Sequence, residues 1–162
     1  AVADATAKKI DQTLTAASSW FVDAGIISPP PRREGVTRFY TSGPNTSAFE
    51  ALSEYGLDVW QVGSEIGQAA GVKMIYSALT KGTAALSMEL LVAAKRTGRY
   101  DALVEEFQMS QAAWFAAMEG SLPGIPNVAG CWIGKMEEIA KTFGDLGLSR
   151  RSIREPQTGT VL

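Results

Sequence analysis

Three side chains that could transfer protons recur at every fourth position in the middle of the chain. A helix over these residues would place Lys73, Ser77 and Lys81 along one side. A lysine can act as a general acid or base near neutral pH when burial and a neighbouring cation lower its pKa. We therefore predict a cleft at this face, with Lys73 as the catalytic residue and Ser77 and Lys81 as substrate-binding residues. The alternative for each lysine is a solvated position on the helix surface.

Two further groups could belong to the same cleft. Tyr76 is the one tyrosine close to Lys73 in the sequence, and it could act as an acid or bind substrate. Ser28 precedes three consecutive prolines, so it could stand in a rigid wall of the cleft or in a simple connector. Arg32 and Arg33 follow the prolines and could bind an anionic substrate, although a surface basic pair is usually only solvated.

Composition excludes several classes of function. The 162 residues include no histidine and one cysteine, Cys131, which we expect to be a small core residue. This removes the Ser-His nucleophile pair, the histidine base and most zinc sites, so we expect no metal. A net charge of −2 and a pI near 5.2 give no reason to expect nucleic acid or an anionic membrane as a partner. No apolar run is long enough to span a bilayer, and the cysteine content suits a reducing, cytoplasmic location.

The first third of the chain predicts the end of an α/β sheet. Hydrophobic periodicity indicates a helix over 4–18, and short apolar or alternating runs predict strands over 20–27, 36–41 and 57–62. The prolines place a loop at 28–35, SGPN (42–45) predicts a turn, and a short helix ending near Tyr55 leads to the third strand. Asp23 falls in the first of these strands, where its buried carboxylate could cap backbone amides.

The rest of the chain predicts only helices. One long helix covers 66–97, with apolar residues on one face and with Gly71 and Gly82 marking close packing against another helix. Further helices are predicted over 100–119 and 128–143, the last with Trp132 and Met136 on its apolar, core-facing stripe, and the tail after residue 148 has little pattern. The apolar face of the long helix consists of Val72, Ile75, Leu79, Leu86 and Leu90.

The expected fold is therefore mainly α: a remnant of a Rossmann-type sheet with about three strands, followed by an all-α domain with one long helix. We predict two domains. Residues 1–63 are the end of an α/β domain, and residues 64–162 form a helical dimerisation and substrate domain.

Three segments, in this order, resemble the C-terminal part of the 6-phosphogluconate dehydrogenase and β-hydroxyacid dehydrogenase superfamily. FVDAGIISPPP (21–31) resembles the family's F-V-D-A strand and substrate loop. LDVWQVGSEIGQAAGVKMIYSALTKG (57–82) resembles its last strand and the G-x-x-x-K start of its long helix. CWIGKMEEIAKTF (131–143) resembles a helix of a less studied branch, whose helical domain is often left unnamed in function.

The resemblance implies roles for particular residues. Lys73 matches the family's active-site lysine, which assists proton transfer at the substrate's hydroxyl or carbonyl. Ser77 stands where the family usually has asparagine. The family's substrate loop holds a carboxylate on the amides of Ser-Gly-Gly, whereas this chain has Ser28-Pro29-Pro30, and proline has no amide hydrogen to donate.

A dinucleotide site needs the motif G-x-G-x-x-G between a strand and a helix, and the sequence has no such motif. We therefore expect this chain alone to bind no cofactor, and the family to use NADP through a nucleotide-binding half that would precede residue 1. One hypothesis is a part or derivative of an NADP-dependent oxidoreductase, an enzyme by ancestry that is not self-sufficient. Another is a stand-alone cofactor-independent isomerase, cyclase or lyase. The third is a non-catalytic dimerisation module. All include a homodimer through the long helix, and the enzymes act on a small molecule.

Overall fold

The computed structural model describes residues 2–28 and 37–148, which divide into two compact units. The first unit consists of residues 1–77 with 135–162, and the second of residues 78–134. The predicted domains, residues 1–63 and 64–162, stay a prediction, because the division into compact units does not test where the functional domains begin and end. The predicted loop beyond Ser28 and the tail from residue 149 lie outside the described residues.

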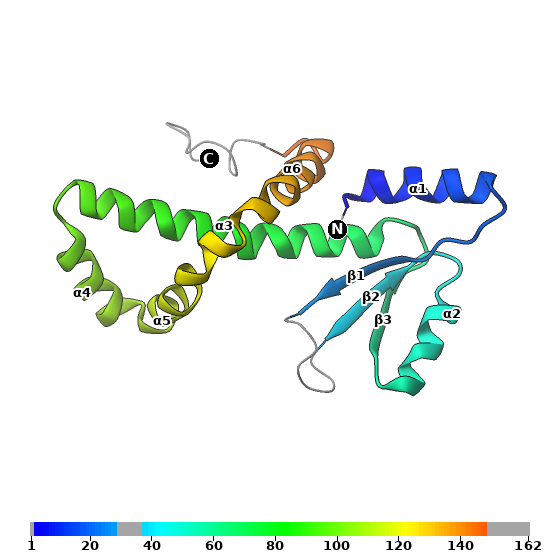
Figure 1. The fold of residues 1–162 in the computed structure, drawn as a ribbon, viewed down its shortest axis with the longest axis horizontal. Helices are drawn as coiled ribbons and strands as arrows, with labels where there is room; N and C mark the ends of the chain where they lie inside the picture. The colour runs from blue at the N-terminus through cyan, green and yellow to red at the C-terminus, as the bar shows by residue number, and fades with distance from the viewer. Residues whose placement is uncertain (1, 29–36, 149–162) are drawn as a thin grey trace. The chain divides into compact units, whose positions relative to one another are not determined.

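A three-stranded sheet forms the centre of the first unit (Figure 1). The strands lie in the order β1-β2-β3, with β1 antiparallel to β2 and β2 parallel to β3. The predicted sheet is confirmed, but its first strand begins later than expected. Trp20 is 86% exposed because the chain is still turning after the first helix, with Ser18 at a φ of 55°. The elements are β1 (Asp23–Ile27), β2 (Arg38–Ser42), α2 (Ser47–Glu50), η1 (Ala51–Tyr55) and β3 (Asp58–Gly63).

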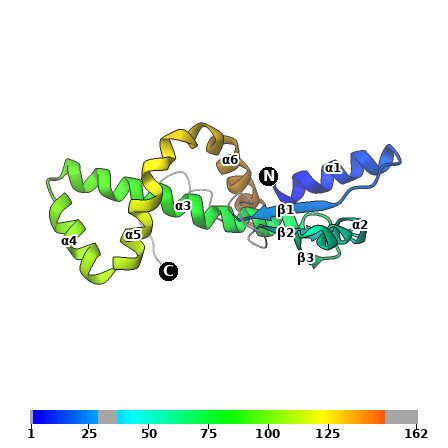
Figure 2. The same cartoon turned by 60° about the horizontal axis from the view of Figure 1, so that its bottom comes forward.

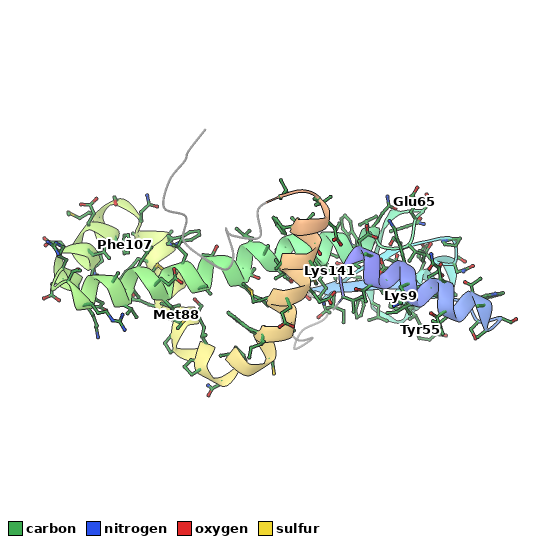
Figure 3. All side chains as sticks on the ribbon, turned by 90° about the horizontal axis from the view of Figure 1, so that it is seen from above. Lys9, Tyr55, Glu65, Met88, Phe107 and Lys141 are labelled. Carbon is green, nitrogen blue, oxygen red and sulfur yellow. The ribbon has the colours of Figure 1, made fainter. Side chains whose placement is uncertain are left out.

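Helix α1 (Asp4–Ala16) closes the core of the first unit. Small residues allow close packing, since the buried cluster contains Ala7, Ala70 and Ile66. The start of α1 is also fixed from α6 (Ala129–Asp145), where the Glu138 carboxylate accepts hydrogen bonds from the Ala3 amide and the Thr6 hydroxyl. Lys141, labelled in Figure 3, donates to the Thr6 hydroxyl at 3.3 Å.

The second unit is entirely helical in the described residues. After α3 (Gln68–Arg96), the chain turns into α4 and then α5, as Figure 2 shows. The single helix predicted over 100–119 is wrong, because the chain breaks at Gln111, whose φ is −137°. The break allows Phe115 to pack against Phe107, with ring centroids 6.1 Å apart. The elements are α4 (Tyr100–Ser110), α5 (Ala112–Ser121) and η2 (Leu122–Asn127).

Helix α3 is one continuous helix of 29 residues, as predicted. Among the described residues its predicted apolar face stays largely uncovered: Val72, Ile75, Leu79, Leu86 and Leu90 are 38–64% exposed. Gly71 and Gly82 have no atom within 4 Å of the position a Cβ would take, so in the described residues they do not pack against another helix as we expected. The predicted mainly α fold with a small sheet is confirmed. No helix in the described residues is long and apolar enough to cross a membrane.

Candidate functional site

A buried carboxylate on the sheet fixes the beginning of α3. Asp23 Oδ2 accepts hydrogen bonds from the backbone amides of Gly67 and Ala70, both at 3.0 Å, and from Ser42 Oγ at 2.9 Å. Ser42 Oγ in turn accepts from the Ala69 amide at 2.9 Å. The first amides of a helix lack partners within the helix and carry partial positive charge, so a carboxylate there stabilises the helix start. The prediction that Asp23 caps backbone amides is therefore confirmed.

Glycine at position 25 lets α3 approach β1. A Cβ added to Gly25 would lie 3.0 Å from the Ala69 carbonyl oxygen and 3.3 Å from the Lys73 Cβ. Gly25 follows Asp23 on the same, buried face of β1. Asp23 and Gly25 together place the first two turns of α3 directly on this strand, which fixes the backbone that carries Lys73.

Replacing Gly25 with valine is expected to lower the free energy of unfolding by about 1–3 kcal/mol, because the side chain would push against the Ala69 backbone. Urea denaturation followed by circular dichroism measures the change. Gly120→Ala in α5 is the control, since its Cβ would meet no atom within 4 Å. The control should gain up to about 1 kcal/mol from helix propensity. Equal stability of Gly25→Val and the wild type would contradict the close approach.

The structure places three of the predicted site residues near the start of α3. Lys73 is half-buried beside Gly25, and Ser77, one turn later, is 8% exposed. Tyr76 lies between them in sequence and is 48% exposed. Lys73 and Ser77 thus share the buried side of α3, whereas Tyr76 borders it.

The two other predicted residues have different surroundings. Ser28 comes directly after β1, and its Oγ is buried with no hydrogen-bond partner among the described residues. A buried hydroxyl of this kind is available to a ligand or to residues outside the described part of the chain. Lys81 belongs to the second unit, where its Nζ lies 5.5 Å from the centroid of the Trp132 ring. Arg32 and Arg33 lie outside the described residues.

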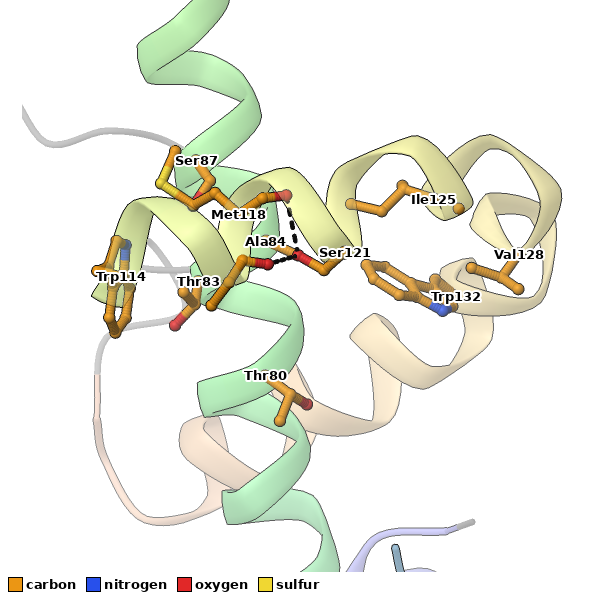
Figure 4. Close-up of a pocket in the computed structure, with 12 residues that line it drawn as sticks. Thr80, Thr83, Ala84, Ser87, Trp114, Met118, Ser121, Ile125, Val128 and Trp132 are labelled. Atoms are coloured by element: carbon orange, nitrogen blue, oxygen red, sulfur yellow. Dashed lines mark hydrogen bonds between the residues drawn. The ribbon is translucent and has the colours of Figure 1, made fainter. Parts of the chain in front are cut away.

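The second unit contains a pocket of about 320 Å³ that sequence analysis did not anticipate (Figure 4). Trp114 and Trp132 stand at its two sides, with Met118 and Ser121 between them. We expected Trp132 to belong to the core, since it shares the apolar stripe of α6, but it lines this pocket instead. The neighbouring Cys131, also predicted in the core, is exposed. The pocket combines α3 with the consecutive elements α5, η2 and α6, which lie far from the α3 lining residues in the sequence, so local spacing gave no signal of it.

We also looked for side chains that could bind a metal ion together. No cluster of three or more cysteine, aspartate or glutamate side chains that could hold an ion occurs among the described residues. The Asp23 carboxylate, which lies near the candidate site, accepts hydrogen bonds from backbone amides. Lys73 and the nearby hydroxyls can supply acid-base chemistry and hydrogen bonds.

Comparison with known proteins places these residues in a family context. Residues 94–157 match the family described as Domain of unknown function (DUF1932). A curated protein from Methanothermus fervidus, described as an uncharacterized 28.5 kDa protein in the 7S RNA 5′ region, is 30% identical over 95 residues. That match covers 59% of this chain and 37% of the relative.

Solved structures share the fold over most of the chain. A conserved protein of unknown function, itself similar in structure to 3-hydroxyacid dehydrogenases, is 26% identical with a TM-score of 0.72, covering 89% of this chain and 55% of its own. A 3-hydroxyisobutyrate dehydrogenase from Salmonella typhimurium is 18% identical with a TM-score of 0.62, covering 91% and 55%. A reductive aminase from Aspergillus terreus, solved with NADPH, is 16% identical with a TM-score of 0.52, covering 93% and 57%.

These similarities confirm the predicted resemblance to the C-terminal part of 3-hydroxyacid dehydrogenase-like proteins. The chain spans about half the length of these solved structures and a little over a third of the curated relative. The similarity to the 3-hydroxyisobutyrate dehydrogenase and to the reductive aminase is one of fold.

Proposed function

We propose that this chain is part of, or derived from, an NADP-dependent oxidoreductase of the β-hydroxyacid dehydrogenase type, and that it contributes substrate-site and dimer residues. The observation that carries this proposal is the position of Lys73. The Asp23 carboxylate and the close approach at Gly25 fix the first turns of α3 against β1, and Lys73 lies in that fixed segment. Preorganisation of this kind is what a general acid or base requires. A reducing, cytoplasmic location accords with the single exposed cysteine.

The proposed role of Lys73 is to move a proton at a substrate oxygen. When a carbonyl is reduced to a hydroxyl, the oxygen gains negative charge and needs a proton, which an ammonium group supplies; in the reverse direction the amine accepts it. Ser77, Tyr76 and Ser28 would orient the substrate by hydrogen bonds, while the predicted substrate contact of Lys81, which belongs to the second unit, stays a prediction. The glycine motif of a dinucleotide site is absent from the sequence, so we expect residues outside this chain to hold NADP.

The proposal is tested by calorimetric titration with NADPH and by an activity assay. The chain alone should show no binding at about millimolar NADPH. Fused behind the nucleotide-binding half of a related 3-hydroxyacid dehydrogenase, it should oxidise 3-hydroxy acids with NADP, followed by NADPH absorbance. A folded fusion that binds NADPH but oxidises no 3-hydroxy acid would contradict the proposal. Isomerase or lyase activity of the chain alone would favour the cofactor-independent alternative instead.

We also propose that two copies associate through α3. Its exposed apolar face is unusual for a surface helix, because the residues that line it are neither scattered nor small. Gly71 and Gly82 have open space at the Cβ position, which leaves room for another helix to come close. A second copy of the same helix would cover both features. A chain that dimerises in this way without any catalytic role is the remaining alternative.

Replacing Leu79 with aspartate is expected to convert the dimer to a monomer, because a buried unpaired carboxylate at an apolar interface costs several kcal/mol. Sedimentation velocity measures the state of association. Val92→Asp is the matched control: Val92 is also an exposed apolar residue of α3, but it lies about 140° around the helix from Leu79. A monomeric wild type, or the same dissociation caused by both variants, would overturn the proposed interface.

A further inference from the structure

The pocket between Trp114 and Trp132 belongs wholly to the second unit, whereas Lys73 belongs to the first. The chemistry of the pocket follows from the residues that line it. Its volume of about 320 Å³ is at the lower end of the range for small-molecule sites. A ligand of one or two rings matches this size.

The walls favour a flat apolar ligand. Indole rings stand at opposite sides of the pocket, contributed by Trp114 of α5 and Trp132 of α6 (Figure 4). The residues between them are buried and apolar: Met118 is 4% exposed and Ile125 7% exposed. Aromatic rings stack or meet edge to face with other rings, and a methionine sulfur also contacts aromatic rings favourably.

A lysine of the same unit contacts the Trp132 ring and stabilises its orientation. Lys81 Nζ lies 5.5 Å from the centroid of the Trp132 ring, close enough for a cation–π interaction. The indole wall is thus held by a neighbour on α3 before any ligand arrives. A preformed wall lowers the entropy cost of binding.

The polar groups of the lining are neutral hydroxyls. Ser121 Oγ uses its proton within α5, donating toward the carbonyl oxygens of Ala117 at 2.7 Å and Met118 at 3.3 Å. Its lone pairs point outward from that bond, so Ser121 can accept a hydrogen bond from a ligand. None of the lining residues carries a charge, so a charged ligand would lose hydration without gaining a partner among them.

From these observations we infer that the pocket binds a small uncharged aromatic molecule that carries one O–H or N–H group, of the phenol or indole type. The ring packs between the two indoles, and the donor group binds the Ser121 hydroxyl. This inference does not depend on the proposed dehydrogenase function, because the ligand would contact neither Lys73 nor the hydroxyl groups of Ser77, Tyr76 and Ser28.

Ligand-observed fluorine NMR tests the inference with three probes. 4-Fluorophenol should bind the full chain, seen as broadening of its fluorine signal. 4-Fluorotoluene, which lacks the donor, should bind about threefold to tenfold more weakly. 4-Fluorobenzoate, which is charged, should bind more weakly than 4-fluorophenol. Tightest binding of the benzoate would overturn the inference in favour of an anion site.

The four tryptophans supply an internal control for the location. In a proton–nitrogen NMR spectrum, the indole N–H signals of Trp114 and Trp132 should shift on addition of 4-fluorophenol. Those of Trp20 and Trp60, which are 86% and 54% exposed and outside the pocket, should not. Equal shifts of all four signals would mean non-specific binding and would overturn the inference.

Two variants in which an alanine of α5 is replaced by leucine test the location of the binding site. Ala117→Leu fills the pocket and should weaken binding of 4-fluorophenol at least about tenfold. Ala116→Leu, at the exposed neighbouring position outside the lining, should leave it within about twofold. If the wild type binds no probe and Ala117→Leu instead dissociates a dimer in sedimentation velocity, a second copy fills the pocket and the inference fails.

Discussion

Replacing Asp23 with alanine is expected to lower the free energy of unfolding by about 3–5 kcal/mol. The substitution removes an acceptor that is 3% exposed and that three donors share: the amides of Gly67 and Ala70 and the hydroxyl of Ser42. These donors stay buried when the carboxylate is gone, so their lost hydration is not recovered. The negative charge that favours the start of α3 is lost as well. Urea denaturation followed by circular dichroism measures the effect.

Two variants separate the cap from a general effect of removing an aspartate. Asp23→Asn keeps one carbonyl oxygen but loses the charge, so its loss of stability should be smaller than that of Asp23→Ala. Asp58→Ala removes the partner of Arg38 in a surface ion pair of 3.4 Å and should cost at most about 1 kcal/mol. Equal losses for Asp23→Ala and Asp58→Ala would show that the buried cap contributes no more than a surface contact.

Replacing Lys73 with alanine is expected to lower kcat about 10²- to 10⁴-fold in the fusion that carries a nucleotide-binding half. The reason is the loss of the group that we propose to move a proton at the substrate oxygen. Binding of NADPH should be unchanged, because this chain contributes no dinucleotide motif. Initial rates of 3-hydroxy acid oxidation, measured over a range of pH, provide the test.

Arginine at the same position distinguishes proton transfer from simple charge. Lys73→Arg keeps a positive charge but cannot give up its proton near neutral pH, so it should also be slow. Lys95→Ala is the matched control, because Lys95 is an exposed lysine in the last turn of the same helix. Full activity of Lys73→Arg would reduce the role of Lys73 to electrostatics, and activity of Lys73→Ala within about twofold of the wild type would remove it from the mechanism.

The sequence predicted the fold well wherever local patterns determine it. Three strands, one continuous long helix and a final helix from Ala129 were all recognisable, because their hydrophobic periodicity and the positions of glycine and proline are local properties. It failed at Gln111, where two helices replace one. No glycine or proline marks that position, and the ring contact between Phe107 of α4 and Phe115 of α5 joins the two helices across the break.

The candidate site was predicted in part. The cap by Asp23 was anticipated because a carboxylate in a buried strand must find donors. The contribution of Ser42 was missed, although it sits in the turn SGPN that the sequence clearly marks. Cys131 was expected in the core and is exposed, because its side of α6 has no described neighbour that covers it.

The sequence by itself therefore determined the order of helices and strands, the resemblance to 3-hydroxyacid dehydrogenase-like proteins, the absence of a dinucleotide motif and the cap at Asp23. Only the tertiary structure decided that the described residues leave the apolar face of α3 largely exposed and that Trp132 lines a pocket. The physical reason is that periodicity identifies which residues share a face. Whether that face is buried depends on segments far away in sequence, and the pocket exists only where α3, α5, η2 and α6 converge.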